Sequence, residues 1–343
     1  MIERILGKTG FSVSALGLGC YQFTSQFGVM PEAANDILDY AIGNGINLFD
    51  TAQSYGFGES EELLGRAKVR NAGKQLAIST KLGNLLKTTV EEVAKTTREM
   101  DWDAYLDPAA IKRAVKHSMW LLRVDQLDIL MIHEYNWPMW KINFETGEGP
   151  VISILEELKK EGLIANIGLG GWDMHTAAQL VKTGKFDAVL AAGGMNLLEK
   201  PIYDELIPAC QEQNTGVMLG GGFGQNTPFL IAQDKEFVEL LKRNPEEKIQ
   251  NMVKKLNCIY EIADELEVSM PELAIRYILA HEEIHSHVAG ARELAHIKNN
   301  MQSAEKGPLP KEYVDKIDQI QKVGKCPTTE EMRDLAKELK SRS

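Results

Sequence analysis

The sequence predicts an α/β fold in which a parallel (β/α)8 barrel, or TIM barrel, carries additional helices at its C-terminus. Short apolar segments alternate with amphipathic ones along the chain, which is typical of strands and helices that alternate. There is no internal repeat, and no Gly-x-Gly-x-x-Gly motif opens a βαβ unit near the N-terminus, which argues against a Rossmann domain. We expect one domain over residues 1–343, with a core of about 1–305 and a helical extension of about 306–343.

Composition excludes several classes of protein. The chain is 44% hydrophobic and 25% charged, as expected for a globular protein with a sizeable core. A formal net charge of −11 argues against a nucleic-acid partner, which requires a basic face. No signal peptide is evident and no apolar run approaches the ~18 residues of a membrane span, so we expect a cytoplasmic monomer or small homo-oligomer without membrane contact. The four cysteines are scattered, so we expect reduced thiols and no metal site; they are Cys20, Cys210, Cys258 and Cys326.

Eight short apolar segments are expected to form the barrel strands. They cover residues 14–19, 45–49, 76–80, 127–132, 163–169, 186–191, 216–219 and 284–289. Apolar residues at helical spacing predict helices over 31–42, 59–68, 107–123, 151–160, 173–182, 201–213, 246–266 and 271–280, with added helices over 310–322 and 328–341. Pro31 opens the first helix and Gly43 ends it, while Asp107 and Pro108 form an N-cap followed by a first-turn proline.

Two long connections are candidates for contact with a ligand. The polar segment 84–106 is long enough either to cover a substrate or to be disordered surface. The loop 134–150 contains a cluster of aromatic residues, Tyr135, Trp137 and Trp140, close to His133. These rings either bind the face of a sugar or another ring, or they only fix the loop in place.

Four polar residues stand where three predicted strands end. Asp50 and Tyr55 follow the second strand, Lys81 ends the third, and His133 ends the fourth. A single Asp, Lys or His after a strand is more often a cap, a surface charge or a hydrogen-bonding group than a catalytic residue. Because parallel α/β barrels place their active sites at the carboxyl ends of several strands, the four together predict a catalytic site.

The residues around these four resemble the aldo-keto reductase family. The matching text is Asp50-Thr51-Ala52 with Tyr55-Gly56, Ser60-Glu61, Leu64-Gly65, Ser79-Thr80-Lys81 and Ile132-His133, and weaker similarity continues to about Asn300. The resemblance implies that Tyr55 is the general acid or base, that Lys81 and Asp50 tune it, and that His133 orients the substrate. It also implies a nicotinamide cofactor, NAD or NADP, and a small-molecule substrate, without a metal.

A glycine-rich turn is the candidate site for the cofactor's phosphates. It follows the seventh strand, where phosphate sites of such barrels often lie, and Val288 to Arg292 after the eighth strand would supply the other half. A turn of this kind also occurs for purely conformational reasons. The cofactor-binding candidates are Gly19, Tyr21, Gly170, Gly171, Asn196, Gly220, Gly221, Gly222, Phe223, Gly290, Arg292, Glu293, His296 and Asn300.

The chain departs from the family after its fifth and sixth strands. Gly170-Gly171-Trp172 replaces a common Ser-Asn, and residues 191–198 lack the usual Gln and an aromatic before Asn196. The sequence of these two segments looks more like the aldose dehydrogenase branch of the family. We therefore expect hydride transfer between NAD(P) and a sugar or sugar-like carbonyl/alcohol pair. The alternatives are a broad aldehyde or ketone reductase and a cofactor-binding regulatory protein with little turnover.

NAD is expected in preference to NADP. NADP-using relatives place a Lys soon after the eighth strand and an Arg on the next turn, and the aligned residues here are Gly290 and His296. Glu293 would repel a 2′-phosphate but accept hydrogen bonds from ribose hydroxyls. Arg292 favours the opposite choice, because a single arginine is able to hold the phosphate.

Overall fold

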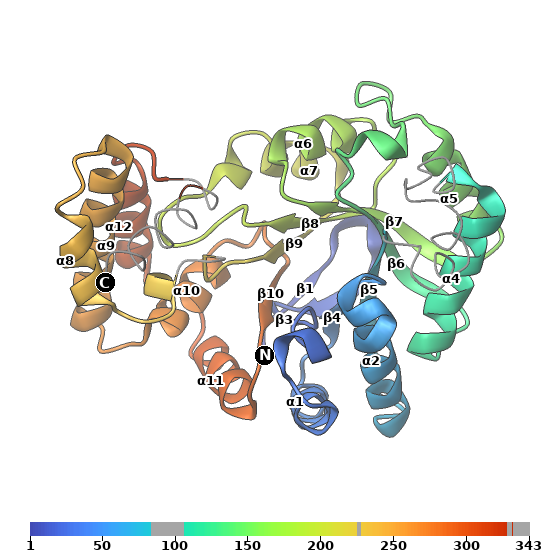
Figure 1. The fold of residues 1–343 in the computed structure, drawn as a ribbon, viewed down its shortest axis with the longest axis horizontal. Helices are drawn as coiled ribbons and strands as arrows, with labels where there is room; N and C mark the ends of the chain where they lie inside the picture. Colours follow the sequence, from blue (N-terminus) through green and yellow to red (C-terminus); the bar gives the residue numbers. More distant parts are fainter. Residues whose placement is uncertain (84–105, 225–227, 328–330, 332–343) are drawn as a thin grey trace.

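The predicted barrel is present. The structure is a computed structural model that describes residues 1–83, 106–224, 228–327 and 331. Eight parallel strands close into a ring, with β10 pairing to both β3 and β9 (Figure 1). The strands are β3 (Leu16–Gly19), β4 (Leu48–Asp50), β5 (Ala77–Leu82), β6 (Leu127–His133), β7 (Ile164–Gly171), β8 (Ala188–Ala192), β9 (Gly216–Gly220) and β10 (Ser286–Gly290).

Amphipathic helices surround this ring (Figure 1). They are α1 (Pro31–Gly43), α2 (Glu59–Arg70), α4 (Pro108–Leu122), α5 (Pro150–Lys160), α6 (Met174–Lys182), α7 (Leu206–Gln213), α8 (Lys235–Leu241), α9 (Glu247–Glu265), α10 (Met270–Leu279), α11 (Leu294–Glu305) and α12 (Lys311–Gln321). Asp107 caps α4 as predicted, since its carboxylate accepts the backbone N–H groups of Ala109 and Ala110 at 3.1 Å each. Within the described residues, none of these helices combines the length and the apolar character that a membrane crossing requires.

An N-terminal hairpin that the sequence did not predict lies before the barrel. Strands β1 (Glu3–Ile5) and β2 (Ser12–Ser14) pair antiparallel, and the buried side chains of Leu6 and Val13 pack against barrel residues such as Leu48 and Met218. The predicted first strand, residues 14–19, was therefore wrong at its start. The backbone N–H of Ala15 still donates to the carbonyl of Ile2, and the barrel strand begins only after it.

Other boundaries also differ from the prediction. The second strand begins at Leu48 rather than residue 45, because Gly45 has a φ of 98° and completes the turn that ends α1. Residues 201–213 are not one helix: Pro201–Tyr203 is a 3-10 turn and α7 starts at Leu206. Helices α8 and α11 were not predicted; α8 is short, and the residues of α11 were interpreted only as cofactor contacts. The proposed covering segment, apart from residue 106, and the final helix at 328–341, apart from residue 331, lie outside the described residues.

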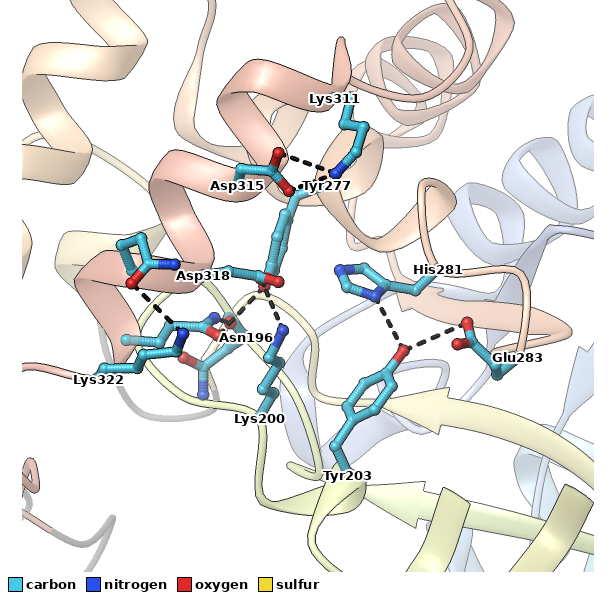
Figure 2. A network of polar contacts seen from close by, with 12 residues as sticks. Asn196, Lys200, Tyr203, Tyr277, His281, Glu283, Lys311, Asp315, Asp318 and Lys322 are labelled. Carbon is cyan, nitrogen blue, oxygen red and sulfur yellow. Dashed lines mark hydrogen bonds and ion pairs between the residues drawn. The ribbon is translucent and has the colours of Figure 1, made fainter. Parts of the chain in front are cut away.

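The C-terminal helices are attached to the loop that follows β8. Helices α8, α9 and α12 gather at one side of the barrel (Figure 1). Asp318 of α12 accepts a hydrogen bond from Tyr277 at 2.6 Å and pairs with Lys200 at 2.7 Å (Figure 2). Gln321 donates to the backbone carbonyl of Asn196 at 2.9 Å. These contacts fix the residue 196–200 loop, which borders the barrel mouth, against α12.

Candidate active site

The four polar residues predicted to form the catalytic site lie at one end of the barrel. Their strands are neighbours and run parallel, so the carboxyl ends of β4, β5 and β6 meet at the same edge. Asp50 ends β4, Lys81 is the penultimate residue of β5, and His133 ends β6. Tyr55 lies on the turn that follows β4, where its backbone N–H donates to the carbonyl of Ala52 at 3.0 Å.

Lys81 connects two of these residues directly. Its ammonium nitrogen lies 2.6 Å from Oδ2 of Asp50, 2.8 Å from the carbonyl oxygen of Thr51 and 3.1 Å from the hydroxyl oxygen of Tyr55. The second carboxylate oxygen of Asp50 accepts a hydrogen bond from Ser79 at 2.6 Å. Lys81 is only 1% exposed, so this buried charge is balanced by a partner and three hydrogen bonds.

The surroundings determine the protonation states of the pair. Burial by itself would lower the pKa of Lys81, but the Asp50 carboxylate and the Tyr55 oxygen outweigh it, and the pKa is raised. Burial raises the pKa of Tyr55, and the nearby Lys81 ammonium opposes that shift without cancelling it. Lys81 is therefore a cation at neutral pH and Tyr55 is a protonated phenol.

His133 lies beside Tyr55 and is neutral. The two ring centroids are 6.1 Å apart and the ring planes meet at 79°. Burial, assisted by the positive charge of Lys81, lowers the pKa of His133 to about 3. A neutral imidazole keeps one N–H, so it is able to donate a hydrogen bond to a substrate oxygen without losing a proton near neutral pH.

The glycine turn after β9 has the shape that close contact with a phosphate requires. A Cβ atom on Gly222 would lie 2.5 Å from Nε2 of His287 and 2.6 Å from Cδ1 of Ile278, so only glycine fits there. Gly221 has a φ of 70°, in the left-handed region that favours glycine. Gly220 and Gly221 are partly exposed and carry no side chain that would shield their backbone from an anion. The turn thus fits the pyrophosphate of a dinucleotide.

The remaining cofactor candidates fall into two groups. Gly19 ends β3, and the exposed Tyr21 packs its ring edge to face against Tyr55 with centroids 4.9 Å apart. After β10, the Arg292 guanidinium lies 5.6 Å from the centroid of the Phe27 ring. Near Arg292 in the chain, Gly290, Glu293 and His296 are exposed, whereas Asn300 is buried. Phe223, after the glycine turn, is partly buried and packs against His287.

The side chain of Asn196 forms hydrogen bonds within its own loop. Its side-chain oxygen accepts the backbone N–H groups of Leu198 at 2.7 Å and Glu199 at 3.2 Å. The residue borders a pocket at the barrel mouth whose wall is completed by Met252 of α9 and by Cys326 and Pro327 after α12. A contact between Asn196 and the cofactor stays a prediction.

Of the three aromatic residues proposed to contact the substrate, two have internal partners. Tyr135 is 1% exposed, and its hydroxyl donates to the carbonyl of Asp173 at 2.7 Å. Trp140 is fully buried, and its indole N–H donates to the carbonyl of His133 at 3.0 Å. These contacts favour the alternative that both rings fix the loop and hold the backbone of His133. Trp137 is 46% exposed and stays a candidate for substrate contact.

Two residues at the mouth were absent from the prediction. Trp172, directly after Gly171, is 44% exposed and lines the pocket together with Asn196, Gly193 and Gly221. Glu134, directly after His133, is partly buried, and the nearby Trp172 indole favours its charged form. The sequence signal that could have identified them is their position, because each directly follows a predicted site residue. No group of three or more His, Cys, Asp or Glu side chains is arranged to hold a metal in the part of the chain that the structure describes.

Comparison with known proteins identifies the family. The model of the Aldo/keto reductase family matches residues 15–322, which extends past Asn300 to α12. The chain is 26% identical to D-threo-aldose 1-dehydrogenase of Pseudomonas sp over 88% of this chain and 92% of that protein. It is 27% identical to the NADH-specific methylglyoxal reductase of Escherichia coli (strain K12) over 86% and 91% of the two chains.

The fold is shared with a solved structure. The aldo-keto reductase AKR11C1 from Bacillus halodurans, in its holo form, superimposes with a TM-score of 0.70. The match is 24% identical in sequence and covers 96% of this chain and 99% of that chain. The chain therefore belongs to the aldo/keto reductase family, whose members are NAD(P)-dependent oxidoreductases that act on small carbonyl compounds.

Proposed function

We propose that this protein transfers hydride between a nicotinamide cofactor and a sugar or sugar-like carbonyl/alcohol pair, with Tyr55 as the general acid and base. The observation that carries the proposal is the direct contact of Lys81 with both Asp50 and the Tyr55 hydroxyl. A protein that only bound the cofactor would not need a buried lysine whose ammonium group contacts the hydroxyl of Tyr55.

The chain's own residues account for the proton and the charge. The nicotinamide, when bound, supplies or accepts the hydride. In reduction, Tyr55 donates a proton to the carbonyl oxygen while the N–H of His133 donates a hydrogen bond to the same oxygen, where negative charge develops. In oxidation, the Lys81 ammonium stabilises the tyrosinate that accepts the alcohol proton. Asp50 holds that ammonium in place and keeps it charged.

The cofactor would be held at two places in the chain, after β9 and after β10. The turn Gly220–Gly222 suits its pyrophosphate, and the exposed residues after β10 suit its adenosine. We favour NAD for two reasons. Glu293 is exposed and able to accept hydrogen bonds from the ribose hydroxyls. Gly290 and His296 stand where NADP-using relatives have cationic residues. One relative is described as NADH-specific, which supports the same choice. Arg292 remains the argument for NADP.

The sugar assignment rests on one relative and on the walls of the mouth. The aldose dehydrogenase similarity supports an aldose as the substrate. The exposed faces of Trp137 and Trp172 offer apolar surface for the C–H face of a sugar. The methylglyoxal reductase similarity favours a second candidate, reduction of small aldehydes or ketones with the same residues.

A rate comparison separates the two candidates. Initial rates with NAD and NADP are followed at the absorbance of the reduced nicotinamide, with a set of aldoses for oxidation and a set of aliphatic and aromatic aldehydes for reduction. The proposal expects kcat/KM for the best aldose to exceed that for simple aldehydes. A strong preference for aromatic or aliphatic aldehydes overturns the sugar assignment but leaves the catalytic roles of Tyr55 and Lys81 open to their own tests.

A further inference from the structure

Glu134 follows His133 in a strained backbone conformation. Its φ is 50°, in the left-handed region that a residue with a side chain seldom adopts. Its backbone N–H nevertheless donates to the carbonyl of Gly170 at 2.8 Å, so the pairing of β6 with β7 continues one residue past His133. Strain of this kind persists where the surrounding structure requires the residue to point in a particular direction.

The carboxylate of Glu134 occupies space beside a residue that has no side chain. Its Oε2 atom lies 3.2 Å from the position that a Cβ on Gly171 would take. The indole of Trp172 lies near enough to favour the charged form of the carboxylate. Burial raises the pKa of Glu134, and the Lys81 ammonium opposes that shift by attracting the charged form. A hydrogen-bond acceptor thus stands at the edge of the candidate catalytic site.

The end of β7 next to this carboxylate has no side chains of its own. Gly170 lies opposite His133 in the β6–β7 register, and Gly171 is the last residue of β7. A Cβ on Gly170 would lie 3.3 Å from Cδ and Cε of Lys81, so the glycine backs directly onto the catalytic lysine. A ring bound at this edge, beside Tyr55 and His133, would therefore meet no side chain from the end of β7.

A nicotinamide ring carries a carboxamide whose NH₂ group has two donors. This group fixes the orientation of the ring, and its donors require acceptors once they leave water. Neither Gly170 nor Gly171 offers a side chain for that purpose. We propose that the Glu134 carboxylate, which lies beside Gly171, accepts a hydrogen bond from the nicotinamide carboxamide.

This inference rests on the proposed function only in requiring a nicotinamide dinucleotide. A charge-assisted hydrogen bond of this kind is stronger than a neutral one. Cofactor affinity should therefore depend on the amide NH₂, and the dependence should be carried by one side chain. Binding alone reveals it, without turnover.

The test measures dissociation constants from the quenching of tryptophan fluorescence, for the full chain, with three ligands. They are NADH, the reduced 3-acetylpyridine analogue, in which a methyl group replaces the NH₂, and ADP-ribose, which lacks the ring. The variants are Glu134→Ala and, as a matched control, Glu145→Ala, an exposed carboxylate in the same loop. Circular dichroism and thermal unfolding establish that each variant is folded.

We expect the preference for NADH over the analogue to fall about tenfold in Glu134→Ala through weaker NADH binding, while ADP-ribose affinity stays within twofold. Glu145→Ala should behave as the wild type. Trp172→Phe, which removes the indole donor but keeps a ring, should lose part of the preference. An unchanged preference in Glu134→Ala, or an equal loss of affinity for all three ligands, overturns the inference. If neither NADH nor ADP-ribose binds the wild type, the proposed function fails and the inference fails with it.

Discussion

The ammonium nitrogen of Lys81 lies 3.1 Å from the hydroxyl oxygen of Tyr55 and 4.8 Å from the centre of its ring. The two residues are 26 positions apart and come from neighbouring strand ends. A cation at this distance leaves the phenol protonated at neutral pH but stabilises the anion that forms when the proton leaves. Tyr55, assisted by Lys81, is therefore able to act as the acid in a reduction and as the base in an oxidation.

The first prediction concerns the phenolic proton. Tyr55→Phe should lower kcat by about 10²-fold or more, because the positioned acid is lost while the ring remains. The affinity for NADH, measured by fluorescence titration, should stay within twofold of the wild type. Near-normal turnover in this variant would end the proposed role of Tyr55. Tyr313→Phe, which removes a hydroxyl on α12 that donates to Glu265, is the control and should retain the activity.

The second prediction concerns the buried ion pair. Lys81→Met should lower the free energy of unfolding by about 3–5 kcal/mol, because it leaves the Asp50 carboxylate buried without its cation. The double variant Lys81→Met/Asp50→Asn should regain part of that stability in urea unfolding but none of the activity. Recovery of turnover in the double variant would show that Lys81 acts only as a structural partner of Asp50.

The third prediction concerns the pH dependence of the reduction. His133, with its pKa lowered to about 3, is neutral at pH 5 and above and should produce no inflection near its ordinary value of ~6.5. Tyr55, whose pKa is raised, should lose its proton only above its ordinary value of ~10, so kcat should stay level from about pH 6 to 9 and fall at higher pH. An inflection between pH 6 and 7 that disappears in His133→Gln would contradict a neutral His133.

The fourth prediction concerns the glycine turn. Gly222→Ala should lower the free energy of unfolding by about 1–3 kcal/mol, because its Cβ would contact His287 and Ile278 at distances that force both to move. The displaced turn should also weaken NADH binding. Gly43→Ala is the matched control, since its Cβ would have no neighbour within 4 Å and its backbone is helical. Equal behaviour of the two variants would argue against the close packing of the turn.

The fifth prediction concerns the choice of dinucleotide. With one good substrate, kcat/KM should be higher with NAD than with NADP, because Glu293 repels a 2′-phosphate and Gly290 and His296 supply no permanent cation. Glu293→Gln should narrow the difference, and Arg292→Ala should lower kcat/KM for NADP more than for NAD. A tenfold advantage of NADP in the wild type, about 1.4 kcal/mol, would show that Arg292 outweighs Glu293.

Local sequence was sufficient for the barrel and for the location of the catalytic residues. Each strand was predicted because a short apolar run is bounded by turn residues, and each of Asp50, Lys81 and His133 directly ends or nearly ends such a run. Parallel strands place their carboxyl ends together, so the alternation of strands and helices brought these residues to one edge. The N-terminal hairpin was not predicted, because Ser14 and Leu16 belong to one apolar stretch that the backbone divides between two sheets.

The tertiary structure decided what each side chain contacts. Tyr135 and Trp140 looked like substrate residues from their place in the loop, but packing buries both and pairs them with backbone carbonyls of Asp173 and His133. The proximity of Glu134 to Gly171 and Trp172 could not be deduced, because it depends on a left-handed backbone and on the register of β6 with β7. Sequence thus determined which groups are available at the barrel mouth. Distances, burial and backbone conformation, which arise only when separate strands pack together, decided which of those groups face one another.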